Sequence, residues 1–456
     1  TVLWDKYHLL YLDGAYGWDQ FDENKVSSRV MDYVAGNLSE TGENSVFRTK
    51  LCEASLLEYM FATDNDGTGM LRQASAYMKR HLPEDVAKKM YQQYQDGKKA
   101  EADGKTEYSV EDADQAIINA KKEKEQADQN DKEGAPQEEA GEKNIQDNEN
   151  NHAQDAEDSK KESPIQIVLQ LKQNALLGMT VSDMSSLSAK AVEAKDMVSN
   201  RQCETGRYDM KKAEKMNVSD RVMVLEYIGK HFSDYTEPGK GDLTYEMEYI
   251  LCGKDTDKKN LESSIERLMR MREAANVAHI IADREKLNQT LMIATSLAGF
   301  SGNPAVVKIV QIGVVAAWAY VESILDLRTL LSGGKISLIK SAAEWTTDLK
   351  KLGEIVTGEG KARECKNGLS YQAYIKQLLF AMKQKKMAYR MMDIMELAMQ
   401  KEQNGKNARM DHMIDNMICE LRFEAKPLFA KRSLYGDMEM GGYMFFKRQK
   451  LSYINE

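Results

Sequence analysis

Glu322 and Asp326 are the residues of this chain whose type and spacing come closest to a catalytic pair. They stand four residues apart, with Trp318 four residues before Glu322, so the three side chains share one helical face. Two carboxyl groups on a mostly buried helix could serve as general acid and base, or as metal ligands. No histidine accompanies them. We therefore interpret them as structural residues that pair with Arg328 or with a basic side chain from another helix.

The other residues that could do chemistry are scattered. Asp411, His412 and Asp415 place a histidine beside two carboxylates, but a second nitrogen or sulfur ligand is missing, which favours a surface network. Residues 238–241 (PGKG) precede an expected strand, whereas a phosphate-binding loop opens a helix. No nucleophile elbow, P-loop or dinucleotide fingerprint occurs. We predict no catalytic, cofactor-binding or metal-binding residues, and therefore no enzyme.

The five cysteines are too few for a disulfide scaffold and lack the spacing of a zinc site. Cys203 and Cys365 share the local pattern Arg-x-Cys-x-x-Gly in turn-like surroundings. If one disulfide exists, we predict that it joins this pair, with two free surface thiols as the alternative. Cys52, Cys252 and Cys419 lie in strand-like runs and are expected to be buried thiols.

The net charge of −9 is concentrated in one tract. Residues 111–163 hold 17 acidic residues and 7 lysines, a net charge of −10, which leaves about +1 for the rest of the chain. A nearly neutral folded part has no basic footprint for nucleic acid. It also lacks a polybasic amphipathic segment that would favour a membrane surface.

We expect neither a signal peptide nor a transmembrane span in this sequence. The most apolar run, residues 309–321, is shorter than the roughly 20 residues that a bilayer requires. The sequence opens at Thr1 directly into an apolar pattern, which is typical of a trimmed or processed start. Any targeting segment would then lie upstream of Thr1.

Composition divides the chain into three predicted parts. Residues 1–99 form an N-terminal α+β segment, and residues 164–456 form a main helical domain whose C-terminal strands complete the sheet. Residues 100–163 are an acidic low-complexity insert that we expect to be disordered or loosely helical, because it cannot bury enough apolar surface to offset chain entropy. We interpret the insert as a tolerated loop expansion, with a flexible partner-binding linker as the alternative.

Hydrophobic periodicity and turn residues locate the main elements. Alternation over residues 245–251 predicts a strand that breaks at Gly253, and spacings of three and four over residues 261–282 predict a helix. Asn303 and Pro304 predict the start of a central buried helix that stops at Gly333. Further strands are expected at residues 51–63, at 419–425 and after Gly442, with further helices at 26–38, 70–95, 219–232 and 370–403. The predicted fold class is α+β, predominantly helical, with long central helices and an antiparallel sheet assembled from sequence-distant strands.

Several blocks of this sequence resemble domain-of-unknown-function family 5702, from Gram-positive, clostridial-type bacteria. The blocks are residues 3–9, 243–261, 272–276, 318–328 and 368–374. Members of that family sit near genes for tight-adherence (Tad) pili, a branch of the type IV pilus systems. The resemblance implies an N-terminal membrane helix just before the first block, a bulk facing outward from the cell envelope, and other pilus or envelope proteins as partners. It supplies no catalytic or binding residues.

Two function hypotheses follow. The first is a non-enzymatic cell-surface or pilus-associated structural or assembly protein of a Tad pilus system, without cofactors. The alternative is an intracellular helical interaction scaffold whose acidic insert recruits a partner. A hydrophobic helix encoded upstream of Thr1 would favour the first, and an initiator methionine there the second. An enzymatic reading would require a cleft that converges on Glu322 and Asp326.

Overall fold

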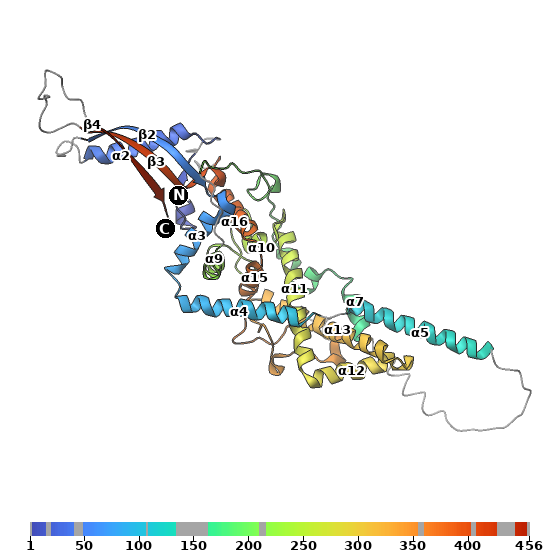
Figure 1. The fold of residues 1–456 in the computed structure, drawn as a ribbon. Helices are drawn as coiled ribbons and strands as arrows, with labels where there is room; N and C mark the ends of the chain where they lie inside the picture. Colours follow the sequence, from blue (N-terminus) through green and yellow to red (C-terminus); the bar gives the residue numbers. More distant parts are fainter. Residues whose placement is uncertain are drawn as a thin grey trace, which may run out of the picture. The chain divides into compact units, whose positions relative to one another are not determined.

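The computed structural model of the protein describes most of the chain and confirms the predicted α+β class (Figure 1). Helices predominate, and the strands form an antiparallel sheet. The described residues are 2–14, 20–40, 49–105, 108–133, 163–208, 216–353, 360–402, 407–425 and 443–453.

The chain divides into two compact units, and each is assembled from segments that are distant in sequence. Unit 1 consists of Thr1–Tyr91, Ser188–Asn260 and Leu379–Glu456, and unit 2 consists of Gln92–Leu187 and Leu261–Leu378. This division differs from the predicted ranges 1–99, 100–163 and 164–456. The reason is that both end segments of the chain pack with the middle segment of unit 1, for example where the Tyr227 hydroxyl donates to the Tyr7 carbonyl at 2.6 Å. Packing between distant segments does not change the local amino-acid composition, so composition could not predict these units.

The sheet of unit 1 is built around β3 (Met413–Ala425). Strand β3 is antiparallel to β2 (Thr49–Phe61) and to both β4 (Tyr443–Ser452) and the short β1 (Leu12–Asp13). The strands predicted at residues 51–63, at 419–425 and after Gly442 are therefore confirmed. Alternate residues of β3 enter the core, where helix α2 (Glu23–Glu40) packs on the sheet through the buried Val26. The core side chains of β3 are Ile414, Met417, Cys419, Leu421 and Phe423.

Helices make up the rest of unit 1. They are α1 (Val2–Asp5), α3 (Asp64–Lys79), α9 (Val218–His231), α10 (Glu246–Cys252) and α16 (Gln384–Gln400), with the 3-10 turns η2 (Ala194–Asp196) and η6 (Met410–His412). The helix predicted over residues 370–403 is two helices, because the chain breaks between α15 (Tyr371–Phe380) and α16. Three of the four boundaries between the units fall inside helices, namely α4 (Glu84–Asp103), α11 (Asp257–Ala282) and α15, and the fourth lies between Leu187 and Ser188.

Helix α10 replaces the strand that the period-two pattern of residues 245–251 predicts. All of its residues are buried, so the alternation does not separate a core face from a solvent face. A half-buried strand would expose Glu246 and Glu248. Each carboxylate instead accepts a backbone N–H of a neighbouring loop, from Ser233 and Tyr235 respectively, both at 2.9 Å. A buried carboxylate is stable where it satisfies backbone donors in this way. Gly253 ends the helix with φ 63°, so the predicted break is confirmed.

Helix α13 (Pro304–Leu331) is the central helix of unit 2. The Asn303 side chain caps it by accepting the N–H of Ala305 at 2.9 Å, and it ends before Gly333, so both predicted boundaries are confirmed. Its buried residues begin at Val310 rather than in the first turn, and burial is continuous from Gly313 to Leu327. The other elements of unit 2 are α5 (Val110–Glu133), α7 (Pro164–Leu171), α8 (Leu176–Thr180), α12 (Arg284–Ala298), η1 (Met184–Ser186), η3 (Gly299–Ser301), η4 (Ala342–Glu344) and η5 (Leu349–Lys351).

Helix α13 is also long and apolar enough to cross a membrane, and it is the one helix in the described part of the chain that meets this test. The expectation of no such segment rested on residues 309–321 alone, whereas the helix has 28 residues. Within its most apolar window, 61% of the residues are buried inside the protein. Buried core helices of folded units share this property.

Part of the predicted acidic insert is helical. Helix α5 packs on α13 through small residues, since a Cβ atom added at Gly313 would lie 2.2 Å from the Ala113 side chain. Glycine at this position therefore permits close helix packing, and the first half of the insert is tied to the core of unit 2. The remainder of the predicted insert, residues 134–162, lies outside the described residues.

Candidate functional site

The predicted carboxylate pair forms a buried ion-paired cluster in unit 2. Glu322 and Asp326 have no exposed surface on α13. Lys340 pairs with Glu322 and, at 2.5 Å, with Asp326, while the Arg272 side chain of α11 contacts Asp326 Oδ2 at 2.9 Å. We call these four residues the four-charge cluster. The prediction of a basic partner from another helix is confirmed by Arg272, whereas Arg328 donates to the Met179 carbonyl at 2.7 Å instead.

Further hydrogen bonds hold the cluster in place. Arg272 donates to the carbonyl oxygens of Ser337 and Leu338 at 3.0 and 2.8 Å, and to the Tyr374 hydroxyl at 2.8 Å. Asn276 donates to the Asp326 carboxylate at 3.0 Å. The sequence blocks 272–276, 318–328 and 368–374 therefore meet here, and the residues that carry the resemblance form a core.

The charge state of the cluster follows from its surroundings. Burial by itself lowers the pKa of Arg272, but Tyr374, Asp326 and Glu322 raise it above its ordinary value, so the guanidinium stays charged. Burial raises the pKa of Tyr374 to about 12, which keeps its hydroxyl protonated at neutral pH. The charged Arg272 guanidinium and the protonated Tyr374 hydroxyl thus lie together in a fully buried site.

The four-charge cluster is arranged for stability rather than for reaction. A general acid or base must come within hydrogen-bond reach of a substrate. The Glu322 carboxylate instead accepts the backbone N–H groups of Thr346 and Thr347 at 3.1 and 2.9 Å, and its side chain has no exposed surface. In the part of the chain that the structure describes, no group of three or more His, Cys, Asp or Glu residues is placed to hold a metal ion.

The predicted disulfide is not formed in the structure. Cys203 and Cys365 are both free thiols, and they belong to different units. Their sulfur atoms donate to nearby backbone carbonyls, of Val198 at 3.6 Å and of Arg363 at 3.7 Å. The acceptors lie five residues before Cys203 and two residues before Cys365, so the shared Arg-x-Cys-x-x-Gly pattern reflects neither a disulfide nor a common local geometry.

Asp411, His412 and Asp415 are buried rather than part of the expected surface network, and each contacts different partners. Asp411 pairs with both Arg201 and Arg409 at 2.7 Å. Burial alone would raise the pKa of Asp411, but hydrogen bonds and the charges of the two arginines hold it well below its usual range. The aspartate is therefore ionised and joins two arginines from distant parts of unit 1.

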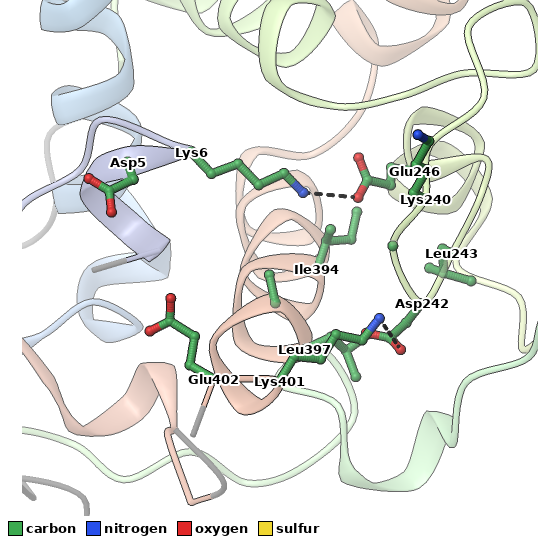
Figure 2. Close-up of a pocket in the computed structure, with 12 residues that line it drawn as sticks. Asp5, Lys6, Lys240, Asp242, Leu243, Glu246, Ile394, Leu397, Lys401 and Glu402 are labelled. Carbon is green, nitrogen blue, oxygen red and sulfur yellow. Dashed lines mark hydrogen bonds and ion pairs between the residues drawn. The ribbon is translucent and has the colours of Figure 1, made fainter. Parts of the chain in front are cut away.

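A surface cleft with a volume of about 580 Å³ lies in unit 1. Figure 2 shows Lys6 reaching across it to Glu246, at 3.4 Å, and Lys401 reaching to Asp242, at 2.8 Å. The remaining lining residues are Asp5, Lys240, Gly241, Leu243, Ile394, Leu397, Ala398 and Glu402. The block 3–9 thus meets the block 243–261 at this cleft, which is a second place where segments of the resemblance come together.

The chemistry of this cleft suits recognition of polar groups. Its size is in the range of small-ligand sites. Among the described residues that line it there is no histidine, cysteine, serine or threonine, so no Ser–His or Cys–His pair is present among them. Two of its lysines are already neutralised by carboxylates across the cleft.

A cluster of aromatic side chains in unit 1 was not predicted from the sequence. His8, His81 and His231 surround the ring of Tyr77, with ring centroids 4.7, 4.3 and 5.4 Å away. The ring nitrogens Nδ1 of His81 and His231 bond to the carbonyls of Tyr77 and Lys6 at 2.7 and 2.9 Å. Burial lowers the pKa of His231 to about 4. These residues come from three distant segments of the chain, so their positions in the sequence did not predict the cluster.

We expect His231 to make the folded state less stable in acid. Its pKa of about 4 in the folded protein lies below the ordinary 6.5, so the unfolded chain binds a proton first as pH falls. The stability that neutral His231 contributes is complete above pH 6.5 and is lost as pH falls towards 4. Urea midpoints at pH 7 and pH 5 should differ less for His231→Gln than for the parent chain. An equal difference in both proteins would refute this assignment.

Comparison with known proteins identifies one family. The model of a family of unknown function, DUF5702, matches residues 154–425. This confirms the resemblance that the sequence blocks indicate. No curated protein and no solved structure matches the chain.

Proposed function

Because the chain belongs to the family of unknown function DUF5702, we propose that it is a non-enzymatic cell-surface or pilus-associated assembly protein of a Tad pilus system. The observation that carries the non-enzymatic part is the four-charge cluster. Its carboxylates are the most enzyme-like feature of the sequence, yet they are sealed and neutralised by Arg272 and Lys340. The pilus part rests on the resemblance described above.

The energetic role of the four-charge cluster supports the proposal that the protein is a non-enzymatic assembly protein. A buried ion pair costs desolvation, and breaking it by removing one partner leaves an uncompensated charge. The sequence blocks of the family converge on this cluster and on the ion-paired cleft, and both hold distant segments of the chain together. Residues with such a role maintain a defined framework, which a binding or assembly protein needs in order to present its surface.

The partners that we propose are other pilus or envelope proteins. The surface of unit 1 supports a binding role, because large apolar side chains are exposed along β4 and just beyond it. We further propose that the protein faces outward from the envelope. Protease treatment of intact cells should then cleave it, while a cytoplasmic marker stays whole. Protection from protease in intact cells would favour the intracellular scaffold instead.

A deletion strain tests the proposed function directly. We expect loss of the gene to reduce the number of Tad pili displayed on the cell, counted by electron microscopy, and expression from a plasmid to restore it. Pilin levels in whole-cell extracts should stay unchanged, since an assembly component acts after synthesis. Normal assembly and display of pili in the deletion strain would refute the proposal.

A further inference from the structure

Strand β4 is the most exposed apolar segment in the described part of unit 1. Every residue from 444 to 453 is exposed. Five large apolar side chains lie within these ten residues, and their exposed fractions are Met444 43%, Phe445 42%, Phe446 61%, Leu451 41% and Tyr453 48%. An exposed apolar patch of this kind on a soluble unit marks an interaction site.

One edge of β4 is open in the described structure. The strand pairs antiparallel with β3 from Tyr443 to Ser452, and no other described strand pairs with it (Figure 1). The core residue Phe423 of β3 stacks on Phe445 of β4, with ring centroids 5.1 Å apart. Helix α2 packs on β2, whereas β4 stays exposed on both faces. An edge strand presents a row of backbone N–H and C=O groups that can pair with another chain.

The charge of β4 indicates which kind of chain could pair with its open edge. The strand carries Lys447, Arg448 and Lys450 and no acidic residue. Its midpoint falls between Lys447 and Arg448, so antiparallel pairing with a second copy in full register would set these cations against each other. Like charges directly opposite each other destabilise strand pairs. The Arg448 side chain is 72% exposed even though it pairs with Glu420 at 2.9 Å, so it remains open to a further anion.

We infer that β4 is a docking edge for an extended, acidic segment of a partner protein, which adds to the sheet as a further strand. Backbone hydrogen bonds along the open edge supply affinity, and side chains supply specificity. The order of residues on β4 sets the pattern of the partner. Met444, Phe445 and Phe446 call for an apolar block, and the following Lys447 and Arg448 call for an acidic block. This inference rests on the proposed binding role and names the chemistry of the partner.

Binding of defined peptides to the full chain tests this inference. The probe is a labelled synthetic peptide of three valines, one threonine and four glutamates, made in both sequence orders. We expect one order to bind at least about tenfold more tightly than the same peptide with lysines, because the cations of β4 attract one and repel the other. Higher salt should weaken binding. Amide hydrogens of residues 443–452 should exchange more slowly in the complex.

Two matched controls separate strand addition from simple charge attraction. Lys447→Glu should weaken binding of the glutamate peptide several-fold, whereas Lys122→Glu, the same charge change on the exposed face of α5, should not. A peptide with alternate backbone nitrogens methylated keeps its charge but cannot pair along one edge, and it should not bind.

Three outcomes would overturn the inference. They are equal binding of the glutamate and lysine peptides, full binding of the methylated peptide, and no binding at all. Concentration-dependent dimerisation that protects the amides of β4 without peptide would also overturn it, in favour of a second copy. Pilus display by the deletion strain is measured independently, so failure of the peptides to bind would leave the proposed function standing.

Discussion

Replacing Lys340 by methionine should destabilise the protein by about 3–5 kcal/mol, the usual cost of breaking a buried ion pair by removing one partner. Lys340 contacts both Glu322 and Asp326, and all three side chains have no exposed surface. Methionine fills the same volume but leaves two buried carboxylates with Arg272 as their remaining cation. Urea unfolding measures the loss, and hydrogen exchange along α13 localises it to unit 2.

Two comparison variants make this prediction specific. Lys259→Met removes an exposed lysine that pairs with Asp255 at 3.0 Å, and it should cost less than about 1 kcal/mol. Glu322→Gln combined with Lys340→Met removes one charge of each sign, and it should be clearly more stable than Lys340→Met alone. A loss of unfolding free energy below about 1 kcal/mol for Lys340→Met would mean that water reaches the carboxylates. That result would favour a catalytic role for Glu322 and Asp326.

Replacing Arg390 by methionine should cost about 3 kcal/mol, because it leaves buried carbonyl groups without donors. The Arg390 guanidinium donates to the carbonyl oxygens of Ile250, Leu251 and Cys252 at 3.0, 2.8 and 2.9 Å. These are the last carbonyls of α10, where a cation also complements the helix dipole. Amide exchange across residues 246–253 should speed up in this variant.

An exposed arginine provides the control for Arg390. Arg270→Ala, on the solvent side of α11, should change stability by less than about 0.5 kcal/mol. Gly253 lies against the same guanidinium, because a Cβ atom at this position would lie 2.3 Å from the Arg390 guanidinium. Its φ of 63° also favours glycine. If Arg390→Met were as mild as Arg270→Ala, the interaction that ends α10 would have to lie elsewhere.

Local sequence chemistry predicted those parts of the fold that depend on neighbouring residues. The cap at Asn303, the stop before Gly333 and the break at Gly253 are each set by one or two residues, and all three are confirmed. Strand β3 alternates apolar and polar residues from Cys419 to Glu424 because its apolar side chains enter the core of the sheet of unit 1. Amphipathic patterns report burial of this kind well.

Features that depend on distant partners could not be predicted. The sequence of helix α10 predicts a strand because its glutamates alternate with apolar residues. The backbone N–H groups that bond to these buried glutamates belong to a loop outside the helix. Spacing singled out Glu322 and Asp326, but Arg272 lies 54 residues from Asp326 and Lys340 lies 18 residues from Glu322. The cleft and the histidine cluster likewise join segments that only the folded chain brings together.

The count of displayed pili in a complemented deletion strain tests the central claim most directly, namely that this protein works by binding and not by catalysis. Glu322→Gln with Lys340→Met removes a candidate catalytic carboxylate, and Lys447→Glu alters the docking edge. The account predicts that the first variant, confirmed as folded by circular dichroism, restores pilus display and that the second does not. Loss of display with the first variant and full display with the second would contradict it.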